Sequence, residues 1–119
     1  MSAKVLVVDD NATMRDLVAL HLRNAGYTVE TATDGIAAGY AVLRSRPDLI
    51  ICEMAMPNLG SVGFVHALRA DATLRNIPVI FLCSDAETLP GIRELRGASF
   101  LRKPIRVDSF LRVVASKVE

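Results

Sequence analysis

The centre of the chain reads Leu49-Ile50-Ile51-Cys52-Glu53-Met54-Ala55-Met56-Pro57. The segment begins as a short, uninterrupted apolar run, which ends in a carboxylate and a loop that contains a proline. A strand inside a parallel sheet has this composition, because helices cover both of its faces and no polar alternation is needed. The run is too short for a helix, and Pro47 just before it disfavours one. We therefore predict a buried strand over 48–53, with Glu53 where the strand leaves the core.

Similar apolar runs recur on both sides of this strand. They predict further strands over 4–8, 27–32, 77–82 and 99–101. Apolar residues at steps of three and four predict helices over 14–25, 36–43, 62–71 and 107–118. A helix over 87–96 is also expected, although Pro90 and Gly91 disfavour its start. Strands that alternate with helices in this way predict an α/β fold, with a doubly wound, five-stranded parallel sheet and helices on both faces.

The composition narrows the class of protein. A length of 119 residues predicts a single domain over 1–119, and the formal net charge of +1 argues against a surface for nucleic acid. No apolar run is long enough to cross a bilayer and the N-terminus lacks a signal-peptide pattern, so we expect a cytoplasmic protein. Cys52 and Cys83 lie in apolar runs and are expected to be reduced residues of the core.

Polar residues follow the predicted strands where each one ends. Asp9 and Asp10 follow the first strand, Glu53 ends the third, Cys83-Ser84 follows the fourth, and Lys103 lies just past the fifth. The carboxyl ends of parallel strands meet at one edge of the sheet, so these side chains should lie together. Grouped carboxylates repel one another unless a hard cation such as Mg²⁺ lies between them. A neighbouring lysine screens this charge or holds a phosphoryl oxygen.

These segments resemble the receiver domain of bacterial two-component response regulators, in particular the single-domain chemotaxis regulators. The likeness covers the whole chain. It rests on Val7-Val8-Asp9-Asp10-Asn11, on residues 47–57 with Met56-Pro57, on Ile77-Pro78-Val79-Ile80, and on residues 97–104. The resemblance implies a flavodoxin-like sheet with the strand order 2-1-3-4-5.

The resemblance also implies roles for individual residues. Asp9 and Asp10 match the acidic pair that holds Mg²⁺, with Asp10 as the direct ligand and Asp9 acting through water. The backbone carbonyl of Ala55 matches the position that completes the metal site. Lys103 matches the lysine that contacts the phosphoryl group, and Phe100 matches the aromatic switch residue.

Three positions depart from the family pattern. The phosphoacceptor is an aspartate in the family, whereas Glu53 stands at the matching position and would also be the third acidic group of the metal site. Its longer side chain moves the carboxylate outward by about one C–C bond, and a misplacement of about 1 Å can cost ~10²-fold in rate. Cys83, a weak donor, stands at the switch Ser/Thr position, with Ser84 beside it as a substitute. Ser61 replaces a glycine.

Simpler interpretations of the same residues stay open at this point. Asp9 and Asp10 are also good N-caps for the following helix. Glu53 is either a structural partner of Lys103 or a mimic of the acyl phosphate's charge. Phe100 is either a plain core or surface aromatic or a working switch. Cys83 is either a redox sensor beside a lysine or, more simply, a small packing residue.

We expect a stand-alone receiver domain in two-component or phosphorelay signalling, degenerate at its acceptor position and not an enzyme. It would act by protein–protein contact with a histidine kinase, a phosphotransfer protein or another signalling protein, as a monomer or weak homodimer, without nucleic acid or membrane. One alternative is inefficient phosphotransfer to Glu53. Another is a small nucleotide- or flavin-binding protein, but residues 9–13 place negative charge where a phosphate loop would be.

Overall fold

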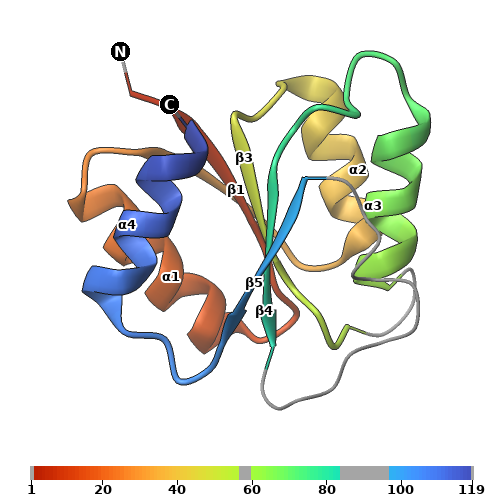
Figure 1. The fold of residues 1–119 in the computed structure, drawn as a ribbon. Coiled ribbons are helices and arrows are strands. Elements are labelled where there is room, and N and C mark those ends of the chain that lie inside the picture. The colour runs from red at the N-terminus through yellow and green to blue at the C-terminus, as the bar shows by residue number, and fades with distance from the viewer. Residues whose placement is uncertain (1, 57–59, 84–96, 119) are drawn as a thin grey trace.

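The computed structural model describes residues 2–56, 60–83 and 97–118. Five parallel strands form one sheet in the order β2-β1-β3-β4-β5, which confirms the predicted topology (Figure 1). The strands are β1 (Lys4–Val8), β2 (Thr28–Ala32), β3 (Leu49–Glu53), β4 (Val79–Cys83) and β5 (Ala98–Arg102), and the helices are α1 (Ala12–Asn24), α2 (Gly35–Arg44), α3 (Ser61–Ala70) and α4 (Val107–Val118). The helix expected over 87–96 and the candidate site residue Ser84 lie outside the described residues.

Helices cover both faces of the sheet. Figure 1 shows α1 and α4 on one face and α2 and α3 on the other. The two faces carry separate apolar clusters, one built around Val18, Leu22 and Phe110 and the other around Ala41 and Phe64. This is the arrangement that right-handed crossovers impose on a parallel sheet.

Strand β3 lies at the centre of the sheet, and all five of its residues are buried. It pairs with β1 on one side and β4 on the other, and Glu53 stands opposite Leu82 in the register. The strand begins one residue later than predicted, at Leu49. Glu53 therefore does end the central strand, at the edge of the sheet where ligand sites of such folds are found.

The helix ends follow ordinary capping chemistry. Asn11 caps α1, because its side chain accepts a hydrogen bond of 2.9 Å from the Met14 N–H. Asp34 caps α2 in the same way, at 2.8 Å from the Ala37 N–H. Gly26 follows α1 with φ of 97°, a left-handed conformation that glycine adopts without strain. Because Asn11 caps α1, the side chains of Asp9 and Asp10 are not needed to cap this helix.

Helix α2 packs differently from what its sequence suggests. Its apolar residues include Ile36, Tyr40 and Leu43, yet these three are exposed, and Ala38 and Ala41 are among those that face the core. Small residues let α2 lie close to the sheet, so its large apolar side chains point outward.

Both cysteines are free thiols, as predicted. Cys52 is buried, which raises the pKa of its thiol far above the ordinary value. Cys83 is half-buried at the end of β4. Over the described ranges, none of the helices is both long and apolar enough to cross a membrane.

Candidate functional site

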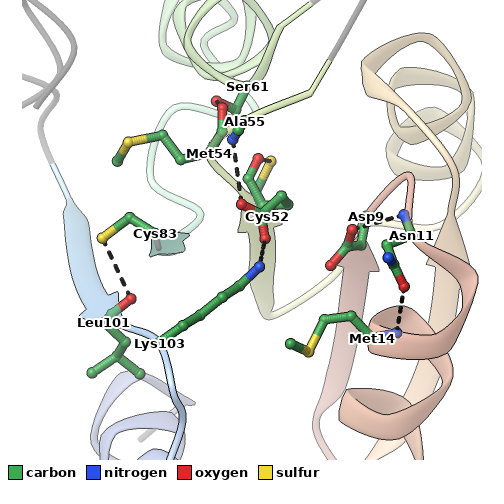
Figure 2. Close-up of polar contacts among 11 residues, drawn as sticks. Asp9, Asn11, Met14, Cys52, Met54, Ala55, Ser61, Cys83, Leu101 and Lys103 are labelled. Atoms are coloured by element: carbon green, nitrogen blue, oxygen red, sulfur yellow. Dashed lines mark hydrogen bonds and ion pairs between the residues drawn. The ribbon is translucent and has the colours of Figure 1, made fainter. Parts of the chain in front are cut away.

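Three strand ends converge at one edge of the sheet (Figure 2). Asp9 follows β1, Glu53 ends β3, and Lys103 follows β5. The Lys103 Nζ donates to Glu53 Oε2 in an ion pair, and the charges of both residues act on Asp9. Segments that lie up to 94 residues apart in the sequence, counting from Asp9 to Lys103, thus form one charged cluster.

Glu53 has both of its carboxylate oxygens engaged. The side chain is almost fully buried, with the residue only 5% exposed. Oε2 pairs with Lys103, and Oε1 accepts a longer hydrogen bond of 3.4 Å from the Ala55 N–H. An ionised carboxylate that leaves water needs such partners, because an unpaired buried charge is costly. Lys103 is therefore the counter-ion of Glu53 in this structure.

Asp9 is the second buried carboxylate, with 2% of the residue exposed. Its Oδ1 accepts a hydrogen bond of 2.9 Å from the Asn11 N–H. Burial raises the pKa of Asp9 above its ordinary value, and the negative charges of Glu53 and Asp10 raise it further, although the Asn11 hydrogen bond and Lys103 oppose them. Asp10 itself is exposed. The negative charge at this edge thus exceeds what Lys103 balances.

The pKa of Asp9 leads to a test by pH. A carboxyl group whose pKa is higher in the folded chain than in the unfolded chain binds a proton more tightly when the chain is folded. The protonated group therefore favours folding, and this contribution is lost as the pH rises through the folded-state pKa. Asp9→Asn removes this charge and keeps an oxygen for the Asn11 N–H. In the absence of divalent cations, we expect the variant to be more stable than the wild type by about 1 kcal/mol at neutral pH.

This gain should shrink as the pH falls towards 3.8, the ordinary pKa of aspartate. Urea unfolding at a series of pH values measures the difference between the two proteins. A variant that is less stable than the wild type by the same amount at every pH would contradict the charge argument and leave only a packing role for Asp9.

The side chains at this edge are of the type that binds magnesium, but there are few of them. Mg²⁺ is commonly held by one or two carboxylates and keeps several waters. Asp9 and Asp10 supply two carboxylates, and the raised pKa of Asp9 indicates a group that a cation would stabilise. Within residues 2–56, 60–83 and 97–118, no three His, Cys, Asp or Glu side chains are grouped closely enough to hold a metal ion. Glu53 as a ligand, and the carbonyl of Ala55, stay predictions.

A backbone hydrogen bond holds Lys103 beside the end of β4. The Lys103 N–H donates to the carbonyl of Cys83 at 2.7 Å, which ties it to the end of β4. The peptide bond between Lys103 and Pro104 is cis. The lysine thus leaves β5 at a defined point and reaches across the end of β4 to Glu53 on β3 (Figure 2).

Two further candidate residues lie on the β5 side of the cluster. The thiol of Cys83 lies 3.5 Å from the carbonyl of Leu101, to which it donates, so its weak donor is directed to β5. The ring of Phe100 stacks on that of Phe81, with 5.6 Å between the ring centroids and 19° between the planes. Phe100 is also partly exposed to solvent, on the edge strand β5. Both roles, switch position and switch aromatic, stay predictions.

Ser61 belongs to the site, although sequence reasoning gave it no role. It is the first residue of α3, is buried, and donates from Oγ to the carbonyl of Met54 at 2.7 Å. This bond ties the residue after Glu53 to α3. The departure of Ser61 from the family glycine was the one signal in the sequence that could have indicated it.

The comparisons with known proteins agree with this geometry. The sequence model of the response regulator receiver domain matches residues 5–115. The chain belongs to the response regulator receiver family. Receiver domains are modules of two-component signalling and are generally not enzymes. The match to this family does not favour the alternative of a nucleotide- or flavin-binding protein.

Among curated relatives, this receiver is similar to RpaA, a DNA-binding dual master transcriptional regulator of Synechocystis sp. The identity is 30% over 110 residues, which is 91% of this chain and 46% of RpaA. It is also similar to the DNA-binding response regulator MtrA of Mycolicibacterium paratuberculosis, with 26% identity over 99% of this chain and 52% of MtrA. The chain spans about half the length of these curated relatives.

Solved structures share the fold along their whole length. The chemotaxis response regulator CheY4 of Vibrio cholerae superposes with a TM-score of 0.89 at 30% identity, covering 98% of this chain and 99% of that one. The receiver domain of the sensor histidine kinase PA1611 from Pseudomonas aeruginosa has a TM-score of 0.84 at 29% identity, covering 99% of this chain and 98% of that one. That structure has a magnesium ion coordinated in its active-site cleft.

Proposed function

We propose that this receiver is degenerate: Glu53 occupies the phosphoacceptor position and does not take phosphate. The observation that carries the proposal is the buried ion pair between Glu53 and Lys103. In the family, the matching lysine contacts the phosphoryl group. Here its ammonium group already neutralises a carboxylate, so a phosphoryl group would have to displace that carboxylate to reach it.

The length of the glutamate side chain supports the same conclusion. In-line attack needs the carboxylate oxygen and the phosphoryl group in one defined geometry, and an extra methylene shifts the oxygen by about one C–C bond. The other oxygen of Glu53 accepts from the Ala55 N–H. Neither oxygen is therefore both free and placed where an aspartate oxygen would lie.

The ion pair also supports a positive role. A carboxylate one methylene longer than aspartate brings negative charge to Lys103 without any phosphate. We infer that Glu53 supplies part of the charge that an acyl phosphate supplies in other receivers. The domain would then signal by contact with a histidine kinase, a phosphotransfer protein or another signalling protein.

Magnesium has a minor part in this proposal. Asp9 and Asp10 would hold the ion with water, and the ion would supply charge neutralisation at the acidic edge. Because Lys103 already neutralises Glu53, the ion would act mainly on the charges of Asp9 and Asp10. Location in the cytoplasm and action without nucleic acid stay predictions.

The direct test is phosphorylation by a small donor. The wild-type chain should stay unlabelled when it is incubated with acetyl phosphate and Mg²⁺. A receiver domain whose acceptor is an aspartate is the control, and it should be labelled in the same assay. Intact-mass spectrometry and a radiolabelled donor measure the outcome. A stable phosphoprotein with the label mapped to Glu53 would instead establish the inefficient phosphotransfer alternative.

A further inference from the structure

A single peptide group connects Ser61 to Glu53. The hydroxyl of Ser61 donates to the carbonyl oxygen of Met54 at 2.7 Å. The N–H of Ala55, at the other end of the same peptide group, donates to Glu53 Oε1 at 3.4 Å (Figure 2). The C=O and N–H of a trans peptide lie in one plane and point in opposite directions. The two side chains therefore hold this peptide group from opposite sides.

The sheet itself does not fix the orientation of this peptide group. The Met54 N–H donates to the carbonyl of Leu82 at 2.9 Å, which holds the nitrogen side of Met54 against β4. The register of β3 and β4 ends at the pair of Glu53 and Leu82, so the peptide group after Met54 lies beyond the paired strands. Its carbonyl and the Ala55 N–H turn together about the Cα–C bond of Met54. The hydrogen bond from Ser61 is what opposes this rotation.

The hydroxyl of Ser61 serves this contact and not the end of the helix. A serine at the beginning of a helix commonly caps it. Here Gly60 is the N-cap of α3, with no hydrogen bond from a side chain, and Ser61 is the first helical residue. Ser61 is only 1% exposed, and its hydroxyl is directed to the carbonyl of Met54. Because the site is buried, water is not at hand to replace the hydroxyl if it is removed.

The chain of hydrogen bonds continues through the carboxylate. Oε1 of Glu53 accepts from Ala55, and Oε2 pairs with Lys103, so the direction of the N–H helps to set the direction of both oxygens. Hydrogen bonds in a buried chain also strengthen one another. Ser61 and Glu53 are both departures from the family pattern, and both lie in this one chain.

We propose that Ser61 is a positioning residue: through the peptide group between them, its hydroxyl keeps the carboxylate of Glu53 directed at Lys103. The inference rests on the proposed function, in which Glu53 is a paired carboxylate, and it adds the residue that holds the pair in place. A glycine at position 61 would leave the same peptide group without this donor.

Ser61→Ala tests the contact by hydrogen exchange. The exchange rate of the Ala55 amide proton should rise at least about fivefold relative to the amides of β3, which report global unfolding. Ser61→Thr keeps the hydroxyl and should restore the wild-type rate. Ser116→Ala is the matched control, because Ser116 also donates to a carbonyl, that of Val113 at 2.6 Å, but lies on α4. It should leave the Ala55 amide unchanged.

A double-variant cycle separates positioning from packing. Glu53→Met keeps an unbranched side chain of similar length but has no oxygen to accept the Ala55 N–H. Ser61→Ala should raise the unfolding equilibrium constant about threefold more in the wild type than in Glu53→Met, because the hydroxyl then has no carboxylate to position. Urea unfolding of the four proteins measures this difference.

Three results would overturn the proposal. They are equal effects of Ser61→Ala in the two backgrounds, an Ala55 exchange rate that does not change relative to β3, and a Ser61→Thr variant that behaves like Ser61→Ala. None of these measurements uses a phosphoryl donor. Labelling of Glu53 by acetyl phosphate would contradict the proposed function and leave the coupling intact, whereas equal effects in the cycle would contradict only the role of Ser61.

Discussion

Glu53→Asp is expected to convert the chain into a phosphate acceptor, with labelling by acetyl phosphate at least ~10²-fold above the wild type. The shorter side chain moves the carboxylate back by about one C–C bond, to the place where the family carries its acceptor. It also withdraws the carboxylate from Lys103, whose ammonium group is then free to contact a phosphoryl oxygen. Radiolabel incorporation with Mg²⁺ present measures the gain, and peptide mapping places the label.

Two further variants show where the defect lies. Glu53→Gln keeps the length of the side chain and removes the nucleophile, so it should stay unlabelled. If Glu53→Asp also stays unlabelled, glutamate is not the only cause, and a further defect lies elsewhere in the site. Cys83 is then the next position to change, because its thiol is a weak donor directed to the Leu101 carbonyl, and Cys83→Ser would restore a hydroxyl.

Lys103→Met should have the largest effect on stability. It removes the counter-ion of a buried carboxylate and leaves Glu53 with the long hydrogen bond from Ala55. Breaking a buried pair on one side costs about 3 kcal/mol or more, because an uncompensated charge stays in the interior. We expect the free energy of unfolding at neutral pH to fall by about this amount in urea titrations without divalent cations. Added Mg²⁺ should restore part of the loss, since a cation then replaces the ammonium group.

The double variant Glu53→Gln, Lys103→Met is the control for this prediction. With no charge left to compensate, it should recover most of the stability that the single lysine variant loses. If Lys103→Met costs nothing and the double variant behaves identically, the pair is solvated in solution and Glu53 needs no counter-ion. Glu53 and Lys103 would then not form a permanent ion pair.

The convergence of Asp9, Glu53 and Lys103 was predictable because parallel strands direct their carboxyl ends to one edge of the sheet. Each residue could be placed at a strand end from the apolar run before it. The partner of each oxygen was less predictable. Asp9, Asp10 and Asn11 are all good caps, and the backbone conformation at Asn11 decided which of them capped α1.

The outward face of α2 was not predictable from its sequence. Ile36, Tyr40 and Leu43 are the largest apolar residues of that helix, and an apolar stripe is ordinarily taken to face the core. The structure buries Ala38 and Ala41 instead. Which side of such a helix is buried depends on how closely it approaches the sheet, and no local pattern records that distance.

The hydrogen bond from Ser61 to the Met54 carbonyl has a mechanical consequence. Ser61 begins α3, and Met54 is the neighbour of Glu53. A molecule that displaces α3 must either stretch this bond or move the backbone beside the acceptor position with it. If binding of such a molecule to α3 changes the affinity of the acidic edge for a ligand, that ligand must change the affinity of α3 for the molecule by the same factor.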